Sequence, residues 1–276
     1  KVPDFFIRKQ TLVNSERYIT DELKEYEEKI LNAEERILSI ENRIFTDLCS
    51  FVLKKVSIIH SNARVLNRMD LLTSFSATAI NENYVQPTLT EKSKLEINAG
   101  RHPVVENLLP STEKFIPNDL TLDAKKNQIH LITGPNMAGK STYLRQVGLI
   151  VLMAQIGSFV PAKSALIGIV DRLFTRVGAS DNLAGGESTF MVEMNEAANI
   201  LHNATDQSLI LLDEIGRGTA TYDGLSLAWA ITEYLHNSEG VNARTLFATH
   251  YHELTDLEST LDRLENHHVE VKEFED

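Results

Sequence analysis

The chain has 276 residues, of which 27 are Lys or Arg and 39 are Asp or Glu, so its formal net charge is -12 at pH 7, and 42% of its residues are hydrophobic. This composition is that of a folded globular protein, and no window approaches the roughly 18 consecutive apolar residues of a membrane-spanning helix. The single cysteine, Cys49, cannot form an internal disulfide and the first residues lack a signal-peptide pattern, so we expect a cytoplasmic protein.

The negative charge is concentrated after residue 100. Residues 1–100 hold 14 Lys or Arg and 15 Asp or Glu, net -1, whereas residues 101–276 hold 13 and 24, net -11. A duplex-binding surface normally gathers Lys and Arg against the phosphates. Because the sequence opens on Lys1 and stops in an acidic run, we expect a piece of a longer chain, which contacts any DNA mostly elsewhere.

The first predicted element is a long helix from about Ser15 to Cys49. Its apolar residues recur at alternating spacings of three and four, which is a heptad seam that must pack on another helix. The seam consists of Leu23, Tyr26, Ile30, Ala33, Ile37, Ile40 and Ile44. A second stripe carries helical periodicity to about residue 78, so we interpret the first eighty residues as an all-helical, structural region without chemistry of its own.

A change of pattern near residues 80–95 predicts a domain boundary, because Asn81–Asn83 breaks the helical periodicity and Pro87 follows. Beyond it, short apolar runs alternate with segments of helix length. The expected strands are 129–133, 208–212 and 245–249, and the expected helices are 141–156, 192–203 and 225–235. Such alternation indicates an α/β domain with a mostly parallel sheet covered on both faces. We therefore divide the chain into a helical region, 1–90, and an α/β domain, 91–276.

A glycine-rich loop follows the first predicted strand, matches G-x-x-x-x-G-K-[ST] and leads into a helix. In such a loop the free backbone N–H groups bind phosphate oxygens, Lys140 would reach the β- and γ-phosphates of ATP, and Ser141 would bind Mg²⁺. The alternative is a glycine-rich turn that happens to precede a lysine. The strand–loop–helix context favours a nucleotide site made by Gly134, Pro135, Asn136, Met137, Ala138, Gly139, Lys140, Ser141 and Thr142.

Polar residues also end the second and third predicted strands. Asp213 would hold Mg²⁺ and Glu214 would orient and deprotonate the attacking water, although a solvated acidic pair is the alternative. His250 lies where open α/β sheets bind ligands and is predicted to sense the γ-phosphate, although a lone His is more often structural. His252, or His267 with His268, would permit a metal site, but no Cys or compact ligand spacing supports one.

Residues 185–190, Gly-Gly-Glu-Ser-Thr-Phe, form a second predicted anion-binding corner before a helix. One nucleotide does not need two such corners from one chain. We therefore interpret Ser188 as facing the γ-phosphate held by another subunit, and a plain helix-capping role is the alternative.

Six motifs in order resemble the ATPase core of the MutS family of DNA mismatch-repair proteins. They are Gly134–Thr142 with Leu144–Gln146, Gly157–Ala162, Ser188–Met194, Asp213–Thr219, Thr221–Gly224 and Phe247–Tyr251. Ile7–Thr11 with Glu16–Ile19 resembles the stretch where the family's chain leaves its DNA clamp and enters helices that act as a lever. Gly100–Val104 resembles the start of the ATPase region, so the resemblance covers essentially the whole chain.

The resemblance implies an ABC-type P-loop NTPase domain preceded by an all-α lever region. It implies hydrolysis of ATP to ADP and phosphate with Mg²⁺, coupled through the helices to movement of a DNA clamp. It further implies a homodimer with composite ATP sites, a MutL-type repair partner, mismatched duplex DNA bound mostly by regions outside this chain, and a place near the nucleoid of a bacterial cytoplasm.

Residue by residue, the resemblance implies that Phe115 and His268 sandwich adenine, that Asn136 is the phosphate-loop Asn, and that Ser188 and His250 approach the γ-phosphate. Two positions depart from the family pattern. Ala138 stands where many members have Gly, and Ala220 replaces a usual hydroxyl residue, which would weaken a contact across the dimer.

Three alternatives stay open. A transporter-type or chromosome-maintenance ABC ATPase would use the same chemistry, but the Gly134–Met137 and Asp213–Thr219 sequences are MutS-like and no long coiled coil interrupts the domain. A non-hydrolysing nucleotide-gated module is disfavoured by the presence of Glu214 and His250. A recombination-restraining MutS paralogue would differ by a nuclease-type tail.

Overall fold

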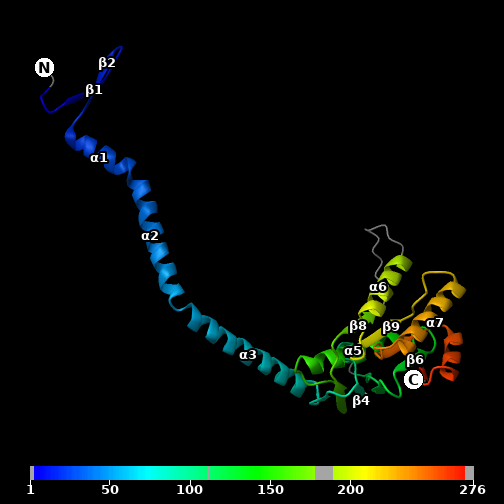
Figure 1. The fold of residues 1–276 in the computed structure, drawn as a ribbon. Helices are drawn as coiled ribbons and strands as arrows, with labels where there is room; N and C mark the ends of the chain where they lie inside the picture. Colours follow the sequence, from blue (N-terminus) through cyan, green and yellow to red (C-terminus); the bar gives the residue numbers. More distant parts are fainter. Residues whose placement is uncertain (1–2, 111, 178–188, 271–276) are drawn as a thin grey trace. The chain divides into compact units, whose positions relative to one another are not determined.

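The computed structural model describes residues 3–110, 112–177 and 189–270 (Figure 1). By its internal contacts the chain divides into two units, Lys1–Leu71 and Leu72–Asp276, and each is considered by itself. Among the described residues, no helix combines the length and the apolar character needed to cross a membrane.

The first unit begins with an antiparallel hairpin. β1 (Ile7–Leu12) pairs with β2 (Ser15–Ile19), and α1 (Asp21–Leu31) follows directly. The Thr20 hydroxyl starts α1 by accepting the Leu23 N–H at 3.1 Å, which satisfies one of the free donors at a helix start. The expectation of an all-α region, and of a helix beginning at Ser15, is therefore wrong, because residues 15–19 pair with β1.

The predicted long helix is also divided. A break at Asn32 separates α1 from α2 (Ala33–Leu53), and α3 (Val56–Asn81) follows after two lysines. The large apolar residues of the heptad seam are about half exposed or more, and neither α1 nor α2 buries a residue. Within the described part of this unit, no other helix covers the seam.

The second unit contains two sheets. One has five strands in the order β11-β6-β10-β9-β8, and all neighbouring pairs are parallel. The other has four strands in the order β3-β7-β4-β5, in which only the β3–β7 pair is parallel. The expectation of a single, mostly parallel sheet is therefore corrected: a mixed, largely antiparallel sheet accompanies the parallel one.

The elements of this unit have the following bounds. The five-stranded sheet consists of β6 (Ile129–Thr133), β8 (Leu173–Arg176), β9 (Leu209–Asp213), β10 (Arg244–Ala248) and β11 (Leu264–His268). The four-stranded sheet consists of β3 (Thr88–Thr90), β4 (Lys94–Gly100), β5 (Asn118–Asp123) and β7 (Ser164–Gly168). The helices are α4 (Pro103–Leu108), α5 (Lys140–Gln155), α6 (Thr189–Asn203), α7 (Thr221–Asn237) and the 3-10 helix η1 (His252–Ser259).

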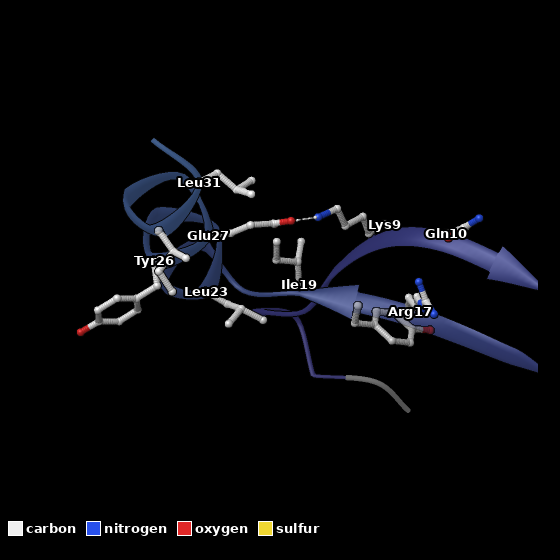
Figure 2. A pocket seen from close by; sticks show the side chains of 10 residues that line it. Lys9, Gln10, Arg17, Ile19, Leu23, Tyr26, Glu27 and Leu31 are labelled. Atoms are coloured by element: carbon white, nitrogen blue, oxygen red, sulfur yellow. Dashed lines mark hydrogen bonds and ion pairs between the residues drawn. The ribbon is translucent and has the colours of Figure 1, made fainter. Parts of the chain in front are cut away.

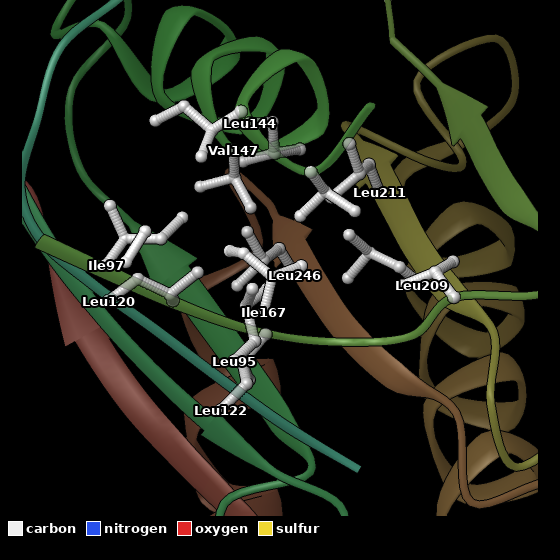
Figure 3. Close-up of a cluster of buried hydrophobic side chains, with 14 of the residues drawn as sticks. Leu95, Ile97, Leu120, Leu122, Leu144, Val147, Ile167, Leu209, Leu211 and Leu246 are labelled. Atoms are coloured by element: carbon white, nitrogen blue, oxygen red, sulfur yellow. The ribbon is translucent and has the colours of Figure 1, made fainter. Parts of the chain in front are cut away.

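Two hydrophobic cores bury the two faces of the parallel sheet. Leu209 and Leu211 of β9 belong to the core shared with α5 and the four-stranded sheet (Figure 3). Ile210 and Leu212 of the same strand belong to the core shared with α6, α7 and η1. Alternate side chains thus enter opposite cores, which explains why the strand is apolar at every position. Because both faces of the sheet are buried, the carboxyl ends of its strands are held in place, and the phosphate loop, the acidic pair and His250 follow those ends.

Candidate functional site

Three strands of the parallel sheet bring the predicted residues to one edge. β10 lies between β6 and β9, so the segments that follow these strands are neighbours. Two backbone hydrogen bonds continue the pairing beyond the strands: Thr249 N donates to the Ile132 carbonyl at 3.0 Å, and Glu214 N donates to the Ala248 carbonyl at 2.9 Å. The phosphate loop, the acidic pair and His250 therefore share the carboxyl edge where open α/β sheets bind ligands.

The loop between β6 and α5 closes around the amine of Lys140. Gly134 has φ +146° and Gly139 has φ +92°, conformations that glycine adopts without a Cβ penalty. Lys140 is buried, and its Nζ donates to the Gly134 carbonyl at 2.8 Å and to the Pro135 carbonyl at 3.0 Å. The exposed Met137 also has a positive φ, +64°. The loop thus curls before the start of α5, whose free N–H groups suit an anion.

Asp213 lies next to the start of α5. Its half-buried carboxylate lies beside the Ser141 side chain, and its Oδ1 atom is shielded from solvent without a hydrogen-bond partner among the described residues. Burial and then the neighbouring Glu214 raise the pKa of Asp213, and the Ser141 hydrogen bond and the charges of Arg145 and Lys140 oppose them. A hydroxyl beside a carboxylate with a free oxygen is a donor set that fits Mg²⁺.

Glu214 has a strained backbone and an ion-paired side chain. Its φ is +51°, unusual for a residue with a side chain, and its Oε2 lies 2.6 Å from Nη1 of the exposed Arg217. The next turn is held from both sides: the Gly216 N–H donates to the Glu193 carboxylate, and the Gly216 carbonyl accepts from the Tyr251 hydroxyl at 3.0 Å. These bonds fix the segment immediately after Glu214.

Sequence reasoning assigned no role to Glu193 and Tyr251, although both lie within motifs that it used. Glu193 is buried on α6 beside Arg176, which also pairs with Glu196 at 2.9 Å. The available signal was a single acidic residue in the apolar run 190–194. Such a residue must find a partner if its side chain is buried.

The remaining predicted residues are distributed around this edge. His250 is exposed, and its ring centroid lies 4.1 Å from that of Tyr251. His268 is exposed at the end of β11, with Nδ1 3.3 Å from the Thr133 hydroxyl. Phe115 is half-buried in the segment before β5, and no ring contact joins it to His268 in the described part of the chain. Thr142 lines a cavity of about 560 Å³ between α4, α5 and β8, and Ser188 lies outside the described residues.

A larger hollow, of about 740 Å³, lies in the first unit between the hairpin and α1 (Figure 2). Its lining includes Lys9, whose Nζ lies 2.7 Å from a carboxylate oxygen of Glu27, together with Leu23 and Tyr26. None of the predicted site residues lies in it. Its mixed, exposed lining carries no chemistry that the sequence had predicted.

Two models of the same protein family match this chain, one near its start and one over its second half. The family model for MutS domain V matches residues 130–276, and that for MutS family domain IV matches residues 1–36. The chain thus corresponds to domains IV and V, which replaces the expected description as an ABC-type domain behind an all-α lever region.

Curated relatives match along the whole chain. The DNA mismatch repair protein MutS of Salinibacter ruber is 59% identical over 275 residues, which are 100% of this chain and 30% of the relative. That of Acetivibrio thermocellus is 61% identical over 273 residues, 99% of this chain and 31% of the relative. That of Bacteroides thetaiotaomicron is 58% identical over 275 residues. The chain spans about a third of the length of these relatives.

Proposed function

The chain belongs to the MutS family of DNA mismatch-repair proteins, and we propose that residues 91–276 bind ATP with Mg²⁺ and hydrolyse it to ADP and phosphate. One observation carries the proposal: the phosphate loop, the Ser141–Asp213 pair and Glu214 meet at the carboxyl edge of one parallel sheet. This is where phosphates, a divalent cation and an attacking water must be brought together.

Triphosphate binding would begin at the phosphate loop. Lys140 exchanges its bonds to the Gly134 and Pro135 carbonyls for bonds to phosphate oxygens. The backbone N–H groups at the start of α5 bind further oxygens, aided by the helix dipole. The ammonium is already buried in the loop, so little side-chain freedom is lost when it turns to the ligand.

Ser141 and Asp213 would hold the cation. Mg²⁺, when bound, neutralises negative charge on the phosphates. The Asp213 carboxylate must be ionised for this role, and its raised pKa means that cation binding weakens at a higher pH than for an ordinary Asp. The exposed His250 would reach toward the γ-phosphate from the neighbouring strand.

Glu214 would take the proton of the attacking water. Oε2 of its carboxylate is paired with Arg217, so that pair would have to loosen for Oε2 to accept the proton. The bonds from Glu193 and Tyr251 to Gly216 hold the backbone beyond Glu214 in place, which would keep the carboxylate aimed at the reaction centre.

The whole protein would couple ATP turnover to DNA repair. We assign to α1, α2 and α3 the transmission of movement between the ATP site and a DNA clamp that binds mismatched duplex outside this chain. We further assign a homodimer in which Ser188 of one subunit completes the ATP site of the other, and a MutL-type repair partner. The relatives are named DNA mismatch repair protein MutS, which supports the repair role.

Two substitutions test the site. Glu214→Gln should keep MgATP binding and slow phosphate release by roughly 10²–10⁴-fold, the usual share of a positioned base. Lys140→Ala should instead lose affinity for the triphosphate. The matched control is Glu239→Gln, at an exposed turn away from the site. Wild-type phosphate release from Glu214→Gln would refute its role, and ATP binding by the unchanged chain without any phosphate release would favour the non-hydrolysing module.

Mixing tests the composite site in the parent-length protein. Lys140→Ala and Ser188→Ala, each inactive alone, should partly restore one another, because a mixed dimer has one site with both residues intact. If half the dimers are mixed and sites act independently, activity returns to roughly a quarter of wild type. No recovery in exchanging dimers would place Ser188 in its own subunit's site or make it a helix cap.

A further inference from the structure

A second polar cluster lies on strands β6 and β11 of the parallel sheet, and it contains none of the residues assigned to ATP binding. His130 of β6 and Glu265 of the edge strand β11 are paired in register, and His267 follows two residues later on the same face of β11. The side chain of His130 is 5% exposed, whereas those of Glu265 and His267 are 45% and 41% exposed. The cluster is therefore anchored in the core and open to solvent on one side.

The three side chains converge without a hydrogen bond between them. Nε2 of His130 and Nε2 of His267 each lie 3.7 Å from Oε2 of Glu265, and the imidazole centroids are 4.1 Å apart. Both Nε2 atoms are shielded from solvent and lack a hydrogen-bond partner. Buried ring nitrogens normally find a partner, because an unpaired one loses its hydration without compensation.

The unpartnered ring nitrogens around the Glu265 carboxylate explain why the arrangement attracts a cation. The Nε2 atoms of His130 and His267 and the carboxylate of Glu265 can each offer a lone pair, and a cation placed between them would bind all three.

The distances suit a metal ion. One candidate ligand atom from each of His130, Glu265 and His267 lies within 4.8 Å of the other two. A cation about 2.0–2.1 Å from each ligand in a tetrahedral site sets neighbouring ligands roughly 3.4 Å apart, so closure requires only small side-chain movements.

We propose that His130, Glu265 and His267 bind one divalent transition cation of the zinc type, with water in the remaining position. Two imidazoles and one carboxylate favour such an ion over Mg²⁺, which prefers all-oxygen sites. The site is thus chemically distinct from the Ser141–Asp213 pair.

The ion would fasten the edge strand to its neighbour. Among the described strands, β11 is paired on one side only, by β6, so bonds from one ion to Glu265, His267 and His130 would restrain its opening. β11 also carries His268 beside Thr133. An effect on adenine binding would follow only if the proposed function of His268 holds, whereas zinc affinity does not depend on it.

The test is a zinc titration of the tag-free 276-residue chain after treatment with EDTA, without nucleotide, followed by competition with a chromophoric chelator. We expect one equivalent to bind, and Glu265→Gln and His267→Ala each to weaken binding roughly tenfold or more. The matched controls Glu270→Gln and His202→Ala change exposed residues of the same types and should bind as the parent chain does. Bound Co²⁺ should give visible absorption bands that both cluster variants lose.

Hydrogen exchange separates this site from adventitious binding. Zinc should slow amide exchange in 266–268 in the parent chain but not in Glu265→Gln. Absence of stoichiometric binding, or binding that both cluster variants retain, would overturn the proposal. If Glu265→Gln and His267→Ala lose zinc affinity but bind ATP as the parent chain does, the metal site is supported and only its link to His268 is rejected.

Discussion

Gly216 and Gly157 form a matched pair that isolates the effect of one close contact on the proposed ATP site. Both have φ +88°, so alanine at either position incurs the same backbone strain of about 1–2 kcal/mol. A Cβ at Gly157, just after α5, would meet no atom within 4 Å. A Cβ at Gly216 would lie 2.6 Å from the Gly224 carbonyl oxygen and 2.7 Å from its Cα, which is backbone that cannot rotate away.

The loss of stability expected for Gly216→Ala can be worked out from the bonds that break when the Gly216 peptide is displaced. Relieving the overlap displaces Gly216 from the Glu193 carboxylate and from the Tyr251 hydroxyl, and each buried group left unpaired costs about 1–3 kcal/mol. We therefore expect Gly216→Ala to lower the free energy of unfolding by about 3–8 kcal/mol. Gly157→Ala should lower it by only about 1–2 kcal/mol.

Urea denaturation measures this difference. Trp229, the only tryptophan, packs against the core beneath α7, so its fluorescence reports on the second unit. With a denaturant slope of about 2 kcal/mol per M, the two midpoints should differ by about 1 M or more. Phosphate release should be lost in Gly216→Ala and kept in Gly157→Ala, because only the first change moves the segment after Glu214. Equal destabilisation by the two changes would show that the contact with Gly224 does not constrain this turn.

Three further predictions concern buried and ligand-binding side chains. Arg244→Met should cost about 3–5 kcal/mol in urea denaturation, because the buried guanidinium donates to three backbone carbonyls at 2.8–3.1 Å; a loss below about 1 kcal/mol would contradict this. The free energy of unfolding in EDTA should fall by about 2 kcal/mol from pH 7.5 to 5, since unfolded His130 takes up a proton near pH 6.5 while the folded pKa is about 3. This contribution is fully present above pH 6.5 and is lost toward pH 3, and a His130→Gln variant with the same slope would assign the effect elsewhere. Phe115→Ala should weaken ATP binding about five- to tenfold in calorimetry and leave inorganic triphosphate unaffected; an equal loss for both ligands would make Phe115 structural.

The sequence by itself determined the elements that depend on neighbours in the chain. The expected strands at 129–133, 208–212 and 245–249 correspond closely to β6, β9 and β10, because strands apolar at every position read as buried on both faces. The loop before Lys140 and the acidic pair at 213–214 were also visible, since each is a contiguous run attached to a strand end. The roles of Ser188, Phe115 and His268 as ligand contacts stay predictions.

The hairpin at the start of the chain was missed because of how hairpins gain stability. Ile7–Leu12 and Ser15–Ile19 are held by cross-strand pairing, which no helical stripe or strong turn dipeptide announces. The four-stranded sheet was missed for a related reason. Its β4 alternates buried Leu95 and Ile97 with partly exposed Lys94 and Glu96, a weaker signal than a continuous apolar run.

Only the tertiary structure decided which distant residues meet. Nothing in the spacing of His130 and His267 indicates a pair, because the register between β6 and β11 brings them together across most of the second unit. Likewise, Glu193 and Tyr251 reach the same peptide group of Gly216 from different elements. Local periodicity determines which segments form helices and strands. Contacts between distant residues depend instead on the order of the strands and on the face that each side chain occupies, and packing of the two hydrophobic cores determines both.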